Sequence, residues 1–404
     1  MARKARLAVV SPFIDKKHGT ERIVAEWIIQ LADAFEIHIY SQRVEDLDLS
    51  KVTWHRIPML PGPHLGNFLW WFVANHAWRT ASRYFRGLRH DIVFSPGPNC
   101  LDADALSIHI VFAAFLKKVR PELAFSRNSW RTWPRLIHRR LYYRLVIAFE
   151  KRVYTRAETQ LILTSRRSAS ELAEFYGRRE PFPAIDAGID RGVFNPSRRL
   201  ELRREARRAL GIGEDDFTLL LIGNDWRKKG LLTLIDAVAR HPEISVQLVV
   251  VSNESDELRR VLRTGALARG RAAILPLRKD VEFYYAAADV YVGPSLEDTF
   301  ALPVAEAMAC GLPVIASAAA GVSEIITDGV DGLILADPRD ADALGAMICR
   351  LHEDKSLRNR LGERAAMTTR RFTWENNGRE LAAIFREILR RKSTGATQTL
   401  TQEL

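Results

Sequence analysis

Cysteine is scarce in this chain, and long apolar runs are missing from it. Its three cysteines, Cys100, Cys310 and Cys349, stand far apart and form no CxxC pair, so the sequence indicates neither a zinc site nor a disulfide framework and fits a reducing cytosol. No window of about 18 residues is apolar throughout, which argues against a membrane-spanning helix. The first apolar run ends at Val10, too early for a signal-peptide core.

The composition is that of a folded, basic protein of 404 residues. Charged residues make up 27% of the chain and hydrophobic ones 47%, which excludes a disordered or collagen-like chain. Sixty Lys and Arg against 49 Asp and Glu leave a net charge of +11. This balance favours anionic partners, which include phosphates, nucleic acid and an acidic membrane surface.

Strand-like and helix-like segments alternate along both halves of the chain, and the pattern restarts after the Pro/Gly-punctuated segment 181–190. Such alternation predicts an α/β protein with two Rossmann-like domains, whose parallel sheets face a central cleft. We expect an N-terminal domain at 1–187, which holds the acceptor, and a C-terminal domain at 188–373, which holds the donor. A helix at 374–391 should pack back on the N-terminal domain, and a mobile tail should follow at 392–404.

The loop 223–230, GNDWRKKG, follows a buried strand and opens a helix. Its cations Arg227, Lys228 and Lys229 oppose the partial positive charge of a helix N-terminus. They become favourable if an anion binds there, because free N–H groups and Lys229 would hold a phosphate. A solvated basic turn is the competing interpretation, and the P-loop pattern GxxxxGK[ST] is absent.

The stretch 294–317 combines an acidic loop, a helix that begins near Leu302 and Pro303, and a strand. The amides that a helix start leaves free can bind an anion. Asp298 on the loop and Glu306 inside the apolar helix are suited to accept hydrogen bonds from sugar hydroxyls. An acidic bias at a helix N-terminus would explain Asp298 but not Glu306.

The spacing of Gly223, Lys229-Gly230, the stretch 294–317 and the segment 321–335 resembles glycosyltransferase family 4, and most of all its bacterial lipopolysaccharide-core glucosyltransferase branch. Members of this family are retaining enzymes of the GT-B fold that use nucleotide-sugar donors. The resemblance implies transfer of a hexose, from a UDP-sugar by preference, to a cell-envelope glycan or glycolipid such as the lipopolysaccharide core. It implies no metal and no cofactor.

The same resemblance assigns the central roles. Lys229 would contact the donor diphosphate, Glu306 the ribose hydroxyls, and Asp298 the donor sugar, with Glu297 as the alternative carboxylate because Asp298 replaces the family's glutamate. His109 would lie beside the transferred sugar. From the residues alone, a histidine that simply ends a strand is the more economical interpretation of His109.

Other positions are implied to surround the donor. Backbone amides near Ala301, Leu302 and Pro303 would enclose the sugar and the phosphate, although proline has no N–H to give. Gly19 matches the second glycine of the family's Gly-Gly loop, and Arg278 lies in the loop expected near the nucleobase.

Several positions depart from the family pattern. Asn224 stands where most members have an arginine, so Arg227 or Lys228 must supply that charge. Ala301 replaces a glycine, and His18 replaces the first glycine of the pair. These departures bear on the identity of the sugar more than on the family.

The region 117–156 carries twelve cations against two glutamates, interleaved with tryptophans and tyrosines. Cations with amphipathic aromatics suit an anionic membrane, which predicts peripheral binding at the inner face of the cell membrane. A solvated charged face is the competing interpretation. Nucleic-acid binding is disfavoured because it leaves the C-terminal half unexplained. A GT-B isomerase of nucleotide sugars remains the alternative enzyme.

Overall fold

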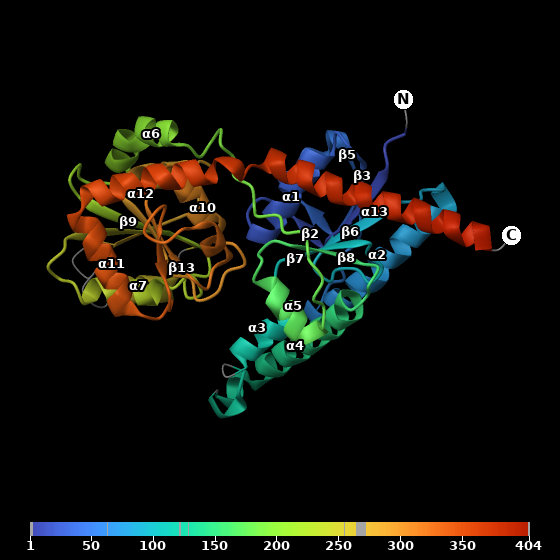
Figure 1. Cartoon of the computed structure of the whole chain (residues 1–404). Helices are drawn as coiled ribbons and strands as arrows, with labels where there is room; N and C mark the ends of the chain where they lie inside the picture. The colour runs from blue at the N-terminus through green and yellow to red at the C-terminus, as the bar shows by residue number, and fades with distance from the viewer. Residues whose placement is uncertain are drawn as a thin grey trace. The chain divides into compact units, whose positions relative to one another are not determined.

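The computed structural model describes residues 3–62, 64–120, 123–127, 129–253, 255–263 and 272–402, without the side chains at 127, 263 and 395–402. The chain divides into two compact units. The first comprises residues 1–186 and 374–404, and the second comprises residues 187–373. Each unit contains its own six-stranded sheet (Figure 1).

The sheet of the first unit is parallel throughout. Most of its strand residues are buried, as expected for a parallel sheet that helices cover on both faces. In sheet order the strands are β5 (Val52–Arg56), β3 (Glu36–Ser41), β1 (Arg6–Val10), β6 (Ile92–Pro96), β7 (Ala105–Ile108) and β8 (Gln160–Leu163). A small pair, β2 (Phe13–Ile14) and β4 (Arg43–Val44), extends this unit. Its helices are α1 (Gly19–Leu31), α2 (His64–Arg86), α3 (Phe112–Val119), α4 (Trp133–Tyr154), α5 (Ser168–Tyr176) and α13 (Trp374–Gln402).

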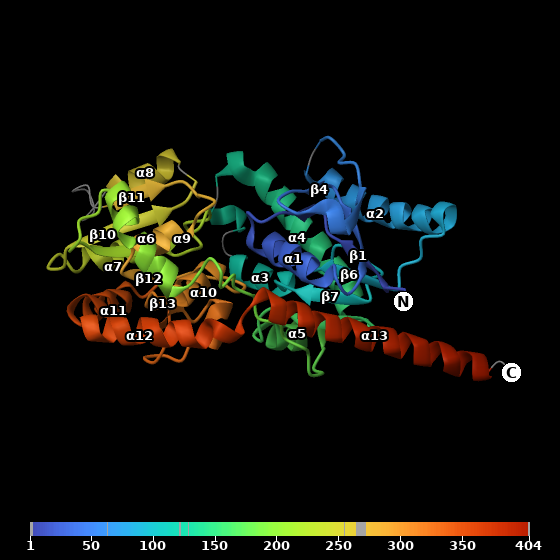
Figure 2. The ribbon, with the colours of Figure 1, turned by 90° about the horizontal axis from the view of Figure 1, so that it is seen from above.

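Helix α13 returns the end of the chain to the first unit, where it packs beside α1 (Figure 2). The ring of Phe385 lies 5.9 Å from that of Phe35 and 5.4 Å from that of Phe94. Gly378 lets the helix approach closely, since a Cβ there would lie 2.4 Å from the Cβ of Gln30. The helix continues to Gln402, so the expected tail at 392–404 begins inside it, and residues 403–404 lie outside the described part.

The second unit repeats the architecture with a second parallel sheet. In sheet order its strands are β11 (Ala272–Leu275), β10 (Val246–Val251), β9 (Phe217–Ile222), β12 (Val290–Gly293), β13 (Val314–Ser317) and β14 (Leu333–Leu335). Its helices are α6 (Pro196–Ala209), α7 (Leu231–Ala239), α8 (Asp256–Arg263), α9 (Glu282–Ala287), α10 (Leu302–Ala309), α11 (Ala341–Glu353) and α12 (Lys355–Thr368).

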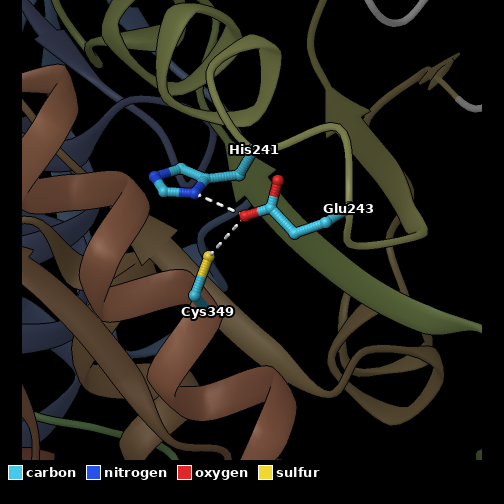
Figure 3. A group of neighbouring side chains, drawn as sticks. All are labelled: His241, Glu243 and Cys349. Carbon is cyan, nitrogen blue, oxygen red and sulfur yellow. Dashed lines mark hydrogen bonds and ion pairs between the residues drawn. The ribbon is translucent and has the colours of Figure 1, made fainter.

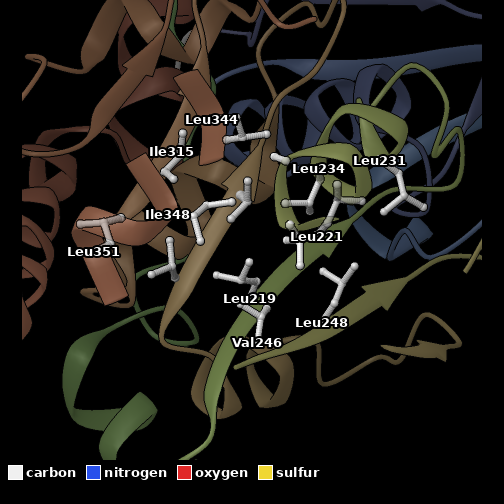
Figure 4. Close-up of a cluster of buried hydrophobic side chains, with 14 of the residues drawn as sticks. Leu219, Leu221, Leu231, Leu234, Val246, Leu248, Ile315, Leu344, Ile348 and Leu351 are labelled. Carbon is white, nitrogen blue, oxygen red and sulfur yellow. The ribbon is translucent and has the colours of Figure 1, made fainter. Parts of the chain in front are cut away.

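One face of this second sheet packs on α7 and α11 through aliphatic side chains (Figure 4). The cluster is fully buried and includes Leu219, Leu221, Leu231, Leu234, Val246, Leu248, Leu344 and Ile348. Burying a leucine or isoleucine of this kind stabilises the fold by roughly 1.5–3 kcal/mol. The two parallel sheets with their helices confirm the predicted α/β class with two Rossmann-like domains.

Strand order decides which loops meet. In the second sheet β9 and β12 are neighbours, although β10 and β11 lie between them in sequence. The loops that leave their carboxyl ends therefore run side by side, and the N–H of Leu296 donates to the carbonyl of Lys228 at 2.8 Å. In open α/β sheets this edge is where ligands bind. Within the described part of the chain, no helix has both the length and the apolarity to cross a membrane.

Three histidines pack together against the edge of the first sheet. The Nδ1 of His38 lies 3.1 Å from the Nε2 of His55, and the ring of Tyr40 stacks on His55 with centroids 4.5 Å apart. His90 packs edge-on against both His38 and Tyr40. Burial, together with the charge of His38, lowers the pKa of His55 and of His90 to about 4.

Acid should destabilise the first unit through these histidines. They stay neutral in the folded chain but bind protons in the unfolded one, so their contribution to stability is complete above pH 6.5 and is lost as the pH falls toward about 4. We expect His90→Gln to reduce the loss of unfolding free energy over this range, measured by urea unfolding. His76→Gln, at an exposed histidine of α2, is the control and should keep the wild-type dependence. Equal slopes in wild type and His90→Gln would contradict the expectation.

Candidate functional site

Two glycines shape the loop after β9. The Lys229 side chain passes so close to Gly223 that a Cβ there would lie 2.6 Å from the lysine Cγ. Gly230 has a φ of +79°, and a Cβ there would lie 1.9 Å from the carbonyl oxygen of Pro294. Only glycine therefore allows the lysine to lie across the strand end while the two loops touch.

Lys229 forms an ion pair with Asp298 on the loop after β12, through Nζ and Oδ2. The other carboxylate oxygen of Asp298 accepts the N–H of Ala301 at 3.0 Å. The side chains of Lys229 and Asp298 are 24% and 16% exposed, so the pair is largely shielded but still reached by solvent. Asp298 thus joins the cation to the start of α10, and whether Asp298 or Glu297 contacts the donor sugar stays a prediction.

Ala301 immediately precedes α10 in the left-handed conformation, with φ +69° and ψ +63°. For a residue with a Cβ this conformation costs roughly 1–2 kcal/mol. The cost explains why the family pattern has glycine at this position. Leu302 and Pro303 follow as the first helical residues, so the N-terminus of α10 lies beside the Lys229–Asp298 pair.

Glu306 lies inside α10 and is only 3% exposed. Its Oε2 accepts a hydrogen bond of 2.8 Å from the hydroxyl of Tyr285 on α9. A carboxylate in an apolar helix is costly unless a partner offsets its desolvation, and Tyr285 is such a partner. The sequence did not single out Tyr285, since an aromatic in the short apolar run EFYYAA is typical of core packing.

Arg227 and Lys228, the other two cations of the loop 223–230, form ion pairs with other carboxylates. Arg227 stacks on Trp226 at 4.6 Å and pairs with Glu257. Lys228 pairs with Asp225 at 3.3 Å. Lys229 thus pairs with Asp298, whereas Arg227 and Lys228 pair with Glu257 and Asp225.

Arg278 is likewise held by its own loop. Its guanidinium pairs with Asp280 at 2.7 Å and lies over the ring of Phe283 at 4.4 Å from the centroid. A role toward a nucleobase stays a prediction for this residue.

Two of the predicted residues, His109 and Gly19, belong to the first unit. His109 follows the end of β7 directly and is buried, with Nε2 2.9 Å from the Oγ of Ser107. Its Nδ1 is also buried and has no hydrogen-bond partner among the described residues. Burial lowers its pKa to about 4, so the imidazole is neutral near pH 7. The histidine is therefore only half satisfied by the protein.

Gly19 is the first residue of α1, and open space surrounds the position of its missing Cβ. The preceding turn is fixed by Asp15, whose carboxylate accepts the N–H groups of Lys17 and His18 at 2.8 and 3.0 Å. The backbone at Gly19 is thus accessible to a ligand.

Two family models match the chain. Residues 18–192 match Glycosyltransferase Family 4, and residues 203–368 match Glycosyl transferases group 1. The chain belongs to the group 1 glycosyltransferases of family 4, and its fold is GT-B. The predicted family is confirmed.

Curated relatives include D-inositol 3-phosphate glycosyltransferases. The protein from Xylanimonas cellulosilytica is 31% identical over 250 residues, which are 58% of this chain and 58% of that protein. The one from Acidothermus cellulolyticus is 29% identical over 267 residues, or 61% of this chain and 57% of that protein. The chain thus spans little more than half the length of these relatives.

Solved structures share the fold. WaaG, a glycosyltransferase involved in lipopolysaccharide biosynthesis, has a TM-score of 0.76 at 22% identity, over 94% of this chain and 99% of WaaG. HepE from Anabaena, in complex with UDP and glucose, has a TM-score of 0.70 at 18% identity, over 95% of this chain and all of the HepE chain (100%).

Tyr285→Phe should weaken nucleotide binding, because Glu306 then loses the hydroxyl that orients it. Hydrogen bonds to charged groups contribute about 1.5–3 kcal/mol, and part of that loss also falls on the free protein, so we expect the Kd for UDP to rise several-fold to about tenfold. Isothermal titration calorimetry measures this change. Tyr84→Phe, at an exposed tyrosine of α2 in the other unit, is the control and should keep the wild-type Kd. An unchanged Kd in Tyr285→Phe would refute the role.

Proposed function

We propose that this chain is a retaining hexosyltransferase that takes a hexose from a nucleotide sugar, preferably a UDP-sugar, and binds the donor diphosphate at the Lys229–Asp298 pair of the second unit. One observation carries the proposal: a single carboxylate, Asp298, holds the ammonium group of Lys229 beside the N-terminus of α10. A cation and a helix N-terminus that converge are suited to a diphosphate. HepE, which shares this fold, was solved with UDP and glucose.

The charges fit the chemistry of the departing group. When the sugar leaves, the nucleoside diphosphate gains negative charge, which Lys229 and the N-terminus of α10 stabilise. Asp298 keeps the ammonium in place before the donor arrives. Its second oxygen remains bound to Ala301, so the helix start keeps its geometry. In this family the leaving phosphate oxygen takes the proton of the acceptor, and no residue has to act as a strong base.

Glu306 supplies the ribose contact in this proposal. Ribose hydroxyls donate hydrogen bonds, and a buried carboxylate accepts them strongly. The hydroxyl of Tyr285 fixes one oxygen of that carboxylate. In the first unit, Gly19 and neutral His109 are the residues that we assign to the donor, and the Nδ1 of His109, which has no partner among the described residues, is suited to bond a sugar hydroxyl.

The acceptor is a cell-envelope glycan or glycolipid, of which the lipopolysaccharide core is one example. WaaG, which shares the fold, is involved in lipopolysaccharide biosynthesis. The curated relatives are named for D-inositol 3-phosphate, which is a small phosphorylated polyol. The basic first half of the chain suits either a phosphorylated glycolipid or a soluble phosphate ester, so acceptor assays should include both.

Lys229→Ala should lower kcat by about 10²–10³, as expected when one group that stabilises a developing anion is lost. The measurement is UDP release from a panel of UDP-sugars with lipid-linked and soluble acceptors. Lys355→Ala, an exposed lysine on α12, is the control and should keep full activity. Full activity of Lys229→Ala would overturn the site. Conversion of the nucleotide sugar without acceptor or UDP release would instead indicate an isomerase.

We further propose that α4 binds the inner face of an anionic membrane. Trp133, Ile137 and Leu141 follow one another at four-residue spacing on α4 and are 44%, 55% and 45% exposed. Trp130, just before the helix, is also exposed. Exposed arginines flank this apolar stripe: Arg135, Arg139 and Arg144 on α4, and Arg131 just before the helix. Apolar side chains with surrounding cations match an anionic lipid surface.

Replacing Trp133 and Ile137 together by serine should reduce binding to anionic vesicles by about tenfold or more, since burial of one such side chain contributes roughly 1.5–3 kcal/mol. Cosedimentation with phosphatidylglycerol vesicles measures the change, and phosphatidylcholine vesicles should bind weakly. Leu200→Ser, at an exposed leucine of α6 in the other unit, should bind as wild type does. If the wild-type protein does not bind anionic vesicles, the membrane proposal is refuted, and the proposal for the donor site is unaffected.

A further inference from the structure

A second group of potential ligands lies in the second unit, apart from the residues of the donor site (Figure 3). His241 and Glu243 lie on the loop between α7 and β10, and Cys349 lies on α11. The Nδ1 of His241 is 2.8 Å from Oε1 of Glu243, and the Sγ of Cys349 is 3.9 Å from the same oxygen. One ligand atom of each residue lies within 4.8 Å of those of the other two.

Gly345 fixes the orientation of the histidine. A Cβ at this position would lie 2.4 Å from Cδ2 and 2.5 Å from Nε2 of His241, so only glycine admits this edge of the ring. The Nδ1 edge is left facing Glu243 and Cys349 (Figure 3). Glycine inside a helix costs roughly 0.5–1 kcal/mol relative to alanine. Here it lies four residues before Cys349, which places both positions on the same side of α11.

The charges around the group favour a cation. The carboxylate of Glu243 lies in contact with both the imidazole of His241 and the thiol of Cys349. The nearest cation on the same loop, Arg240, is engaged by Asp236 and Asp342 at 2.7 and 2.6 Å. The second of these ion pairs ties the loop to the start of α11 and so holds the two ligand-bearing segments together.

We propose that His241, Glu243 and Cys349 bind a transition-metal ion of the Zn²⁺ class that joins the loop 240–245 to α11. An imidazole nitrogen, a carboxylate oxygen and a thiolate are the ligand types of zinc sites, and a water completes the tetrahedron. On binding, the Cys349 thiol gives its proton to solvent and a sulfur–metal bond forms. Glu243 is exposed and turns to make room for the ion between the three groups. The ion connects the loop 240–245 to α11 and takes no part in sugar transfer.

Sequence spacing could not reveal this group. Glu243 and Cys349 are 106 residues apart, and neither belongs to a CxxC or HxxxH pattern. The interpretation that the cysteines indicate no zinc site followed from that spacing alone. Only the packing of α7 and α11 on the same sheet brings the ligands together.

Cobalt(II) is the probe, because thiolate ligation gives a charge-transfer band in the near ultraviolet. We expect the reduced, metal-free full-length protein to bind one Co²⁺ with this band, Zn²⁺ to displace it, and Zn²⁺ to raise the Tm. Cys349→Ser should abolish the band, and His241→Gln should weaken Zn²⁺ binding by more than about a hundredfold, beyond the effect of losing a mere supporting residue. Glu353→Gln is the matched control and should keep the band.

Wild-type protein without a thiolate band would overturn the proposal, and so would a band that persists in Cys349→Ser. Glu243 is exposed and His241 and Cys349 are half-buried, so circular dichroism of each variant verifies that the fold is retained. Sugar transfer by metal-free protein should equal that of the Zn²⁺-loaded form at a temperature where both are folded. The metal site and the donor site are therefore tested independently.

Discussion

The ion pair between Lys229 and Asp298 joins two loops that lie 69 residues apart in sequence. It forms because β9 and β12 are neighbours in a parallel sheet, so that their carboxyl ends deliver both loops to one edge. Gly230 lets the loops touch, and Gly223 leaves room for the lysine side chain. The same carboxylate holds Ala301 in the left-handed conformation that starts α10. One aspartate thus fixes both a cation and a helix N-terminus.

The stability of the second unit comes mainly from its buried aliphatic cluster and not from this ion pair. The aliphatic cluster between the sheet, α7 and α11 buries its leucines completely, whereas the ion pair is partly solvated and contributes little net free energy. A buried carboxylate such as Glu306 costs stability unless it is hydrogen-bonded. Ligand binding therefore explains the presence of the Lys229–Asp298 pair and Glu306 in apolar surroundings better than fold stability does. The buried aliphatic cluster keeps these charged groups in fixed positions relative to one another.

Much of this arrangement could be predicted from local pattern. Alternating strands and helices indicated the α/β class, and the loop GNDWRKKG and the stretch 294–317 indicated Lys229, Asp298 and Glu306. The sequence did not show which of these side chains would pair with one another. The sequence indicated Lys229 as the phosphate ligand, but not that Asp298 would be its partner, nor that Arg227 and Lys228 would pair with Glu257 and Asp225. Tyr285 looked like core, and an alanine at 301 gave no signal of left-handed backbone.

The predicted site residue Lys229 of the second unit is a cation, whereas His109 of the first unit is neutral. This difference matches the charges that develop when a glycosyl group is transferred. The leaving diphosphate accumulates negative charge, which suits Lys229 on the second unit. The sugar carbon left behind develops positive charge, as in glycosyl transfer generally, so a cation beside it would raise the barrier. Burial keeps His109 neutral, with a pKa of about 4, while its free Nδ1 can still form one hydrogen bond. If His109 lies beside the transferred sugar, as the family resemblance implies, a buried neutral histidine suits that position better than a lysine or arginine, and the desolvation that costs folding free energy is what keeps the imidazole uncharged there.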